Sequence, residues 1–269
     1  MRIWYNEYGD IMKKIGKSDP IIKQVKDVLK TNQYKNLVAT DDLEILNLAI
    51  KYHLEISHLL ITSDIEYKEQ TKELLSQLIH HAQECFEISL ATYKTIQTKD
   101  NHAGIVAIIK IPTYTLDDLK DFVIVLDHLE IPGNIGTIYR TLDACGATGV
   151  LLVDPITKPN HPKLLASARG TNLILPTVSL PYEQALDYLQ KNGYTIYLGE
   201  PNLGLDYQKY SYEGKIAIVV GNERFGIQED WYHHPHKKVY IPMVGNNNSL
   251  NVGVAASILV YEAAMKRKF

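Results

Sequence analysis

The hydrophobic positions follow two patterns along the chain, and the change comes near residue 120. Before it, amphipathic helical patterns over 19–31, 41–53 and 66–83 alternate with β-rich runs, which are NLVAT, ISHLLIT, FEISL and GIVAIIKIP. Pro20 suits the first turn of the first helix, and Asp41, three residues before Glu44, suits the start of the second. This pattern predicts a small α/β domain over residues 1–112, followed by a linker over 113–121.

From Phe122 onward, short and almost wholly apolar runs are separated by helical segments; these runs are FVIVLD, GVLLVD, TIYLGE, IAIVVGNE and KVYIPM. Such runs are typical of parallel strands that are buried on both faces. Residues 122–269 are therefore predicted to form a parallel sheet with helices on both sides. Ligands bind such sheets beyond the carboxyl ends of the strands. The candidate site loops are therefore HLEIPGNIG, PITKPNHP, PNLG, NERFG and VGNNNSLN.

Composition and charge narrow the functional classes. A hydrophobic content of 45%, a charged content of 22% and the lack of a long apolar segment predict a soluble protein that is neither exported nor membrane-spanning. Two isolated cysteines, Cys85 and Cys145, indicate a reducing cytoplasm rather than a disulfide framework. The net charge of −3 means that any nucleic acid would have to bind a local patch.

Two loops carry candidate chemistry, and each also has an ordinary structural interpretation. In IPGNIGTIYR, the Gly133/Gly136 spacing lacks the GxGxxG fingerprint, which argues against NAD, although Asp154 after the next strand leaves a nucleotide site open. In VVGNERFG, Gly221 permits close approach to the main chain and Glu223 should project into the crevice. The ordinary interpretation of the first loop is a βα connection with an exposed arginine, and that of the second is a solvated polar turn.

The last segment is more informative. Its loop of Gly245 and three asparagines leads to Ser249, a suitable N-cap for a closing helix whose small residues allow close packing. The HHPH run at 233–236 is more typical of a solvated loop than of a metal site, so no metal is expected.

Together, NIGTIYRT, VVGNERFGI and IPMVGNNNSLNVGVAASILVYE resemble, in order and spacing, the three motifs of the SpoU (TrmH-like) branch of the SPOUT RNA methyltransferases. Within that branch, the sequence is most similar in style to the thiostrepton-resistance ribosomal RNA methyltransferases. The resemblance implies a deep trefoil knot in the domain over 122–269 and a substrate-binding N-terminal domain. It also implies methyl transfer from S-adenosylmethionine to a ribose 2′-hydroxyl, with ribosomal RNA preferred, by a cytoplasmic homodimer that pairs through its C-terminal domains.

The same resemblance assigns site residues. Those of the catalytic motifs are Asn134, Arg140, Glu223, Ser249 and Asn251. S-adenosylmethionine would lie against Gly199, Gly221, Asn222, Glu223, Ile241, Met243, Ser249, Leu250 and Asn251, with the glycine–asparagine loop around its adenine. RNA would meet Arg140, as base or as phosphate clamp, and Arg169.

The sequence departs from the family pattern at three places. Ile131 occupies a position that is often Asp, Gly253 one that is often Ser, and NERFG replaces a commoner Ser-Glu-Gly. The alternatives are a transfer RNA 2′-O-methyltransferase, a non-catalytic RNA-binding member of the same fold, and a nucleotide-dependent metabolic enzyme. The presence of all five catalytic-motif residues favours the methyltransferase.

Overall fold

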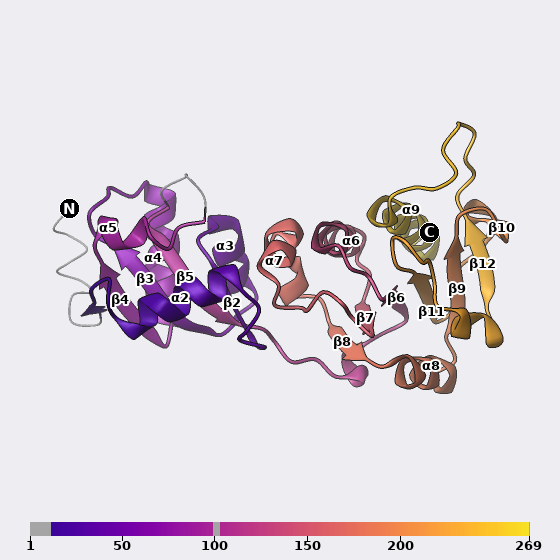
Figure 1. Ribbon diagram of the computed structural model, residues 1–269, viewed down its shortest axis with the longest axis horizontal. Coiled ribbons are helices and arrows are strands. Elements are labelled where there is room, and N and C mark those ends of the chain that lie inside the picture. Colours follow the sequence, from indigo (N-terminus) through magenta and orange to yellow (C-terminus); the bar gives the residue numbers. More distant parts are fainter. Residues whose placement is uncertain (1–11, 99–102, 269) are drawn as a thin grey trace. The chain divides into compact units, whose positions relative to one another are not determined.

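The computed structural model describes residues 12–98 and 103–268, and the chain divides into two compact units (Figure 1). The first holds Met1–Pro112 with Asn160–Pro162, and the second holds Thr113–Pro159 with Lys163–Phe269. The segment expected as a linker therefore belongs to the second unit. It contains a 3₁₀ helix, η1 (Leu116–Asp118). The apolar side chain of Leu119, which follows this helix, is buried in the core of the second unit.

The first unit is built on a five-stranded mixed sheet. Its order is β1 (Met12–Lys14), β4 (Glu84–Ile88), β3 (Ile56–Thr62), β5 (Ile105–Lys110) and β2 (Leu37–Thr40). The pairs β1–β4 and β4–β3 are parallel, whereas β5 runs antiparallel to both of its neighbours. The helices of this unit are α2 (Pro20–Lys30), α3 (Leu43–Lys51), α4 (Glu69–His81) and the short α5 (Leu90–Tyr93).

Aspartates start the first two of these helices. The Asp19 side chain accepts from the Ile21 N–H at 2.9 Å, with Pro20 as the first residue of α2. The start predicted for α3 is wrong by one residue, since Asp42 is its cap and accepts from the Glu44 N–H at 3.0 Å. Asp41 is buried instead, and its carboxylate accepts from the N–H and the hydroxyl of Thr98.

The second unit contains the predicted parallel sheet, and this prediction is confirmed. Its seven strands lie in the order β10 (Leu205–Asp206), β12 (Lys237–Tyr240), β9 (Thr195–Glu200), β11 (Ile216–Val220), β6 (Phe122–Asp127), β7 (Gly149–Val153) and β8 (Thr177–Leu180), and every pair is parallel. The edge strands β8 and β10 were not predicted from the sequence, because one is half-exposed and the other has only two residues.

Helices cover both faces of this sheet (Figure 1). Alternate residues of β6 point to opposite sides: Ile124 packs with α6 (Pro132–Cys145), α7 (Pro162–Ala168) and α9 (Val252–Lys268), and Val125 packs with α8 (Tyr182–Lys191) and η4 (Glu229–His233). Two further 3₁₀ helices are η2 (Thr171–Leu173) and η3 (Tyr207–Lys209). Burial on both faces explains why the central strands contain almost no polar residue.

Close packing joins α9 to α6, although the two helices are far apart in sequence. The hydroxyls of Thr141 and Ser257 are 2.8 Å apart, and Ala256 and Ala263 of α9 are fully buried. No helix in the described ranges is both long and apolar enough to cross a membrane.

Candidate active site

A cavity of about 990 Å³ opens in the second unit beside the carboxyl ends of β9, β11 and β12. Its lining includes residues from each of the three motif segments and from the end of β9. Of the residues predicted for the site, it contains Asn134, Gly199, Gly221, Asn222, Glu223, Ile241, Met243, Ser249, Leu250 and Asn251. The sheet thus brings together segments that span more than a hundred residues of sequence.

The carboxylate of Glu223 anchors this arrangement. It accepts from the Asn134 side-chain amide at 2.9 Å, the Ile131 N–H at 3.1 Å and the Glu130 N–H at 3.2 Å. Ile131 is the N-cap of α6 and makes no side-chain capping bond. Glu223 therefore supplies the negative charge that the positive end of a helix dipole favours.

The chain of hydrogen bonds continues into the third motif. The side-chain amide of Asn251 donates to Asn134 Oδ1 at 3.0 Å, and Asn251 Oδ1 accepts from the N–H groups of Gly253 at 2.9 Å and Val254 at 3.3 Å. Asn251 thus caps α9. The prediction of Ser249 as the cap is wrong, because α9 begins at Val252 and Ser249 lies three residues before it.

A tight turn after β11 presents Glu223. The main chains of Asn222 and Gly226 pair as an antiparallel bridge, and Asn222 Oδ1 accepts from the N–H of Arg224 at 2.9 Å. A Cβ on Gly221 would come within 2.2 Å of the Gly226 carbonyl carbon, so no other residue fits this fold of the turn. The expected close approach at Gly221 is therefore made by the chain itself.

Asp127 supports the same region and was not singled out from the sequence. It is the last residue of β6, has no exposed surface, and accepts from the Gln228 N–H at 2.8 Å and from the Gln228 side-chain amide. It thereby ties the segment that follows the Gly226 turn to β6. An acidic residue at the end of an otherwise apolar strand was the signal available in the sequence.

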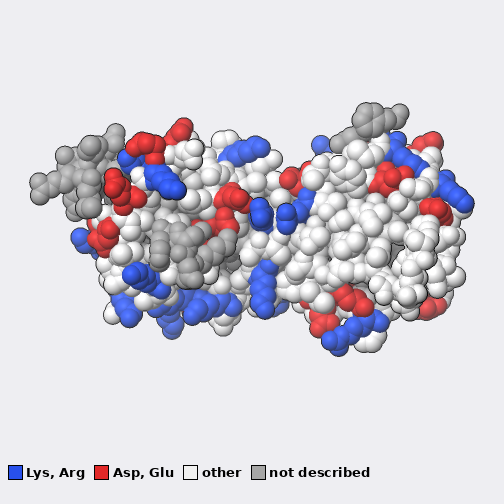
Figure 2. Space-filling model, turned by 90° about the horizontal axis from the view of Figure 1, so that it is seen from above, with Lys and Arg blue, Asp and Glu red and all other residues white. Residues whose placement is uncertain are grey.

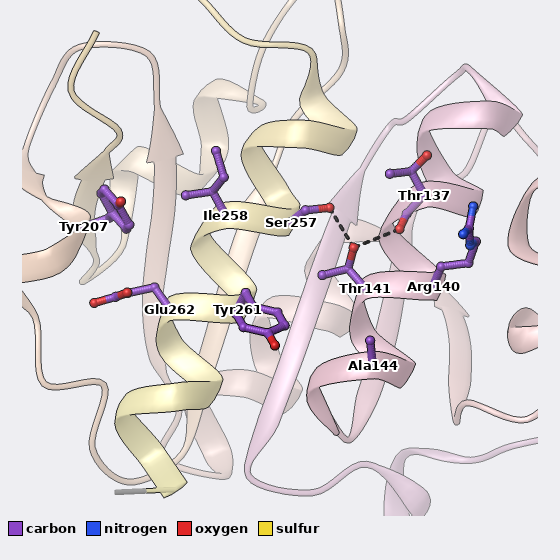
Figure 3. Close-up of a pocket in the computed structure, with 9 residues that line it drawn as sticks. All are labelled: Thr137, Arg140, Thr141, Ala144, Tyr207, Ser257, Ile258, Tyr261 and Glu262. Carbon is purple, nitrogen blue, oxygen red and sulfur yellow. Dashed lines mark hydrogen bonds between the residues drawn. The ribbon is translucent and has the colours of Figure 1, made fainter. Parts of the chain in front are cut away.

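Arg140 lies in a different hollow, away from the residues grouped with it by the motif. This hollow has a volume of about 690 Å³ and is lined by Thr137, Arg140, Thr141, Ala144, Tyr207, Ser257, Ile258, Tyr261 and Glu262. Figure 3 shows Thr141 directed at Ser257 of α9, whereas the Arg140 side chain leaves α6 on the other side. Arg140 follows Asn134 by six residues, about 9 Å along a helix axis.

Two other predicted features lie outside the large cavity. Arg169 is exposed just after α7, in the left-handed region with φ of 51°. Asn246, Asn247 and Asn248 are exposed and do not line the cavity, so the loop expected around an adenine stands away from it here. Within the described ranges, no group of three or more His, Cys, Asp or Glu is placed to hold a metal.

Comparison with known proteins gives a consistent family. The model of the SpoU rRNA Methylase family matches residues 121–261. The chain is 29% identical over 201 residues to the 23S rRNA (guanosine(2553)-2′-O)-methyltransferase RlmP of Bacillus subtilis, covering 75% of this chain and 80% of that protein. It is 34% identical over 152 residues to a putative TrmH family tRNA/rRNA methyltransferase of Staphylococcus aureus, covering 54% of this chain and 59% of that protein.

Solved structures share the fold over nearly the whole chain. An AdoMet-bound rRNA methyltransferase from Sinorhizobium meliloti superposes with a TM-score of 0.81 at 22% identity, covering 94% of this chain and 97% of that one. An RNA 2′-O ribose methyltransferase gives a TM-score of 0.78 at 26% identity, covering 96% of this chain and 100% of that one. Because the family model spans more than half of the sequence, the protein belongs to the SpoU rRNA Methylase family.

Proposed function

We propose that the protein transfers a methyl group from S-adenosylmethionine to a ribose 2′-hydroxyl of RNA, with ribosomal RNA as the preferred substrate. One observation carries the proposal: Glu223, Asn134 and Asn251 are joined by hydrogen bonds at one cavity, so the three motifs form one site. The Bacillus subtilis relative, which is named for this reaction on 23S rRNA, matches over most of its length and supports the choice of RNA.

The cavity fits S-adenosylmethionine in size and chemistry. Its 990 Å³ lies at the upper end of the roughly 300–1,000 Å³ that small-molecule sites occupy. Ile241, Met243 and Leu250 offer apolar surface for the adenine, and the carboxylates of Glu200 and Glu229 suit the ligand's ammonium and ribose hydroxyls. When bound, S-adenosylmethionine supplies an electrophilic methyl group on a positively charged sulfur.

The residues of the chain supply orientation. Glu223 holds Asn134 and the start of α6 in one geometry, and Asn251 fixes α9 against them. In-line attack by a hydroxyl needs such alignment, and positioning can contribute up to about 7–11 kcal/mol in favourable cases. We assign Arg140 to an RNA phosphate, because a guanidinium binds phosphate through two parallel bonds and holds its protons too tightly to be a good base.

The same proposal includes a homodimer through the outer face of α6 and α9. Val254, Ile258 and Tyr261 repeat at i, i+4 and i+7 along α9 and form an apolar stripe, with Val254 46% and Tyr261 49% exposed. Ile258 and Tyr261 also line the hollow that contains Arg140. A second copy would cover this stripe, and it would place the Arg140 hollow at the subunit boundary.

Three further features complete the proposal. The segment 241–251 is threaded so that α9 closes a deep trefoil knot, an arrangement supported by the bonds from Asn251 and Ser257 back to α6. The first unit recognises the RNA, while Arg169 faces the substrate. An RNA substrate and two buried cysteines that form no disulfide, Cys85 and Cys145, fit a cytoplasmic protein.

Incubation with S-adenosylmethionine labelled in its methyl group tests the function. The RNA is ribosomal RNA transcribed in vitro, which carries no modification, with transfer RNA transcripts in parallel. We expect label in ribosomal RNA at a single nucleotide whose 3′ linkage resists alkali, as 2′-O-methylation requires. Label in transfer RNA alone would change the substrate, and no label in either RNA from folded protein would refute the reaction.

A further inference from the structure

Charge is strongly polarised within the first unit, although the whole protein is slightly acidic. Residues 12–36 contain seven lysines and two aspartates, a net charge of +5. Residues 37–112 contain six lysines and eleven Asp and Glu residues, a net charge of −5. Figure 2 shows Lys and Arg side chains in a nearly continuous row along the lower edge of this unit.

The positive stretch is centred on one face of α2. Ile22, Val25, Val28 and Leu29 are buried on the inner side of this helix. Lys23, Lys26 and Lys30, at i, i+3 and i+7, therefore share the outer side. Lys17 before the helix and Lys35 after it are both exposed. We call these five residues the lysine face.

Carboxylates within the described residues leave the lysine face largely uncompensated. Lys13 and Lys14 on β1 form ion pairs with Glu84 and Glu87, at 3.5 and 3.8 Å. Within the described ranges, the ion pairs found include none from the lysine face. Asp27 is the single acidic residue of α2, and it would have to serve both Lys23 and Lys30.

This charge pattern does not favour the helix itself. A lysine near the C-terminal end, such as Lys30, complements the helix dipole, but Lys23 lies in the first turn, where a cation is unfavourable. Lys26 and Lys30 are a like-charged pair at i and i+4, which is also unfavourable. Stability of α2 therefore does not explain the lysine face, whereas an anionic partner would.

We propose that the lysine face binds the phosphate backbone of the RNA substrate, outside the nucleotide that is methylated. This inference rests on the proposed function. Lys23 and Lys30 are separated by about 10 Å of helix rise, so their long side chains can contact more than one phosphate of an RNA strand. Lysine heads on flexible stems neutralise phosphates without reading bases, so this surface contributes affinity and register rather than sequence choice.

The test compares two triple variants with equal loss of charge. Lys23→Gln/Lys26→Gln/Lys30→Gln removes the centre of the lysine face, and glutamine keeps nearly the helix propensity of lysine. Lys51→Gln/Lys68→Gln/Lys94→Gln removes three exposed lysines elsewhere in the same unit. The probe is fluorescein-labelled, in-vitro-transcribed 23S ribosomal RNA, with affinity measured at several salt concentrations.

We expect the first variant to bind RNA at least tenfold more weakly, with the slope of log affinity against log salt reduced by about one for each lysine. The control variant should stay within about twofold of the wild type. S-adenosylmethionine binding should be unchanged in both variants, and the melting temperature should not decrease in either. Equal RNA binding by the two variants, or loss of binding to phosphatidylserine vesicles but not to RNA, would overturn the inference. Failure of the wild type to methylate any RNA would instead count against the proposed function.

Discussion

At the scale of single residues, Glu223 joins two of the motif segments through its carboxylate. Its three hydrogen bonds hold the loop before α6, the N-cap of that helix and the Asn134 amide. An uncharged replacement would keep the shape but present a donor toward main-chain N–H groups. Hydrogen bonds to a charged group typically contribute about 1.5–3 kcal/mol, so the loss should be visible in catalysis.

We therefore expect Glu223→Gln to reduce the rate of methyl transfer roughly 10- to 100-fold, since each 1.4 kcal/mol corresponds to a factor of ten. The rate is measured with labelled S-adenosylmethionine and ribosomal RNA at saturation. Glu183→Gln is the control, because Glu183 is exposed on α8 and does not line the cavity. Similar rates for the two variants would show that the bonds of Glu223 do not matter for the reaction.

Arg140 allows a second prediction at this scale. A lysine keeps the charge but cannot make two parallel bonds to one phosphate. Arg140→Lys should therefore lower kcat/KM by about tenfold or more, while Arg224→Lys, an exposed arginine at the large cavity, should change it little. Near wild-type turnover in Arg140→Lys would refute the bidentate phosphate clamp.

At the scale of elements, the buried parallel strands were predictable and the ends of helices were less so. ISHLLIT, FVIVLD and TIYLGE coincide with β3, β6 and β9, because burial on one or both faces leaves a continuous apolar run in the sequence. The start of α9 differs, because the sequence predicts Ser249 as its cap and the structure has Asn251 there. Ser249 and Asn251 are both good capping residues by type, and only the contact with Asn134 decides between them.

Loss of this cap gives a prediction for stability. Asn251→Ala removes the acceptor for the Gly253 and Val254 N–H groups, which should cost about 1 kcal/mol and lower the melting temperature of the second unit by about 2–4 °C. Ser249→Ala should leave it unchanged, as measured by differential scanning calorimetry. An equal or larger decrease for Ser249→Ala would return the cap to Ser249.

At the scale of the whole molecule, the limits of the sequence become clear. The motifs identified the residues around the cavity, but hydrogen bonds that join positions 89 and 117 residues apart have no local signal. Asp127 was missed for the same reason, since its partner Gln228 is 101 residues away. The separate hollow of Arg140 has no signal in the sequence either, because the motif gives the spacing along α6 and not the direction in which the Arg140 side chain points.

The proposed dimer is tested at this scale. Tyr261→Glu places a charge on the apolar stripe of α9 and should shift the protein from dimer to monomer in light scattering after size-exclusion chromatography. Lys266 cannot serve as the control, because it bonds to the Tyr210 carbonyl. The control is Asp187→Lys. Asp187 is exposed on α8, at the opposite face of the sheet from α9, so this variant changes charge away from the stripe and should remain dimeric. A dimeric Tyr261→Glu protein would place the interface elsewhere.

The central claim is that the large cavity binds S-adenosylmethionine, and calorimetric titration of the purified protein tests it most directly. We predict saturable binding of S-adenosylmethionine, one molecule per chain, with no binding of NAD. Gly221→Ala should abolish or strongly weaken it, since its Cβ would force the Gly226 turn open, whereas Gly133→Ala, which has open space around it, should bind normally. Folded wild-type protein that binds no S-adenosylmethionine, or binds it equally well with Gly221→Ala, would contradict the account.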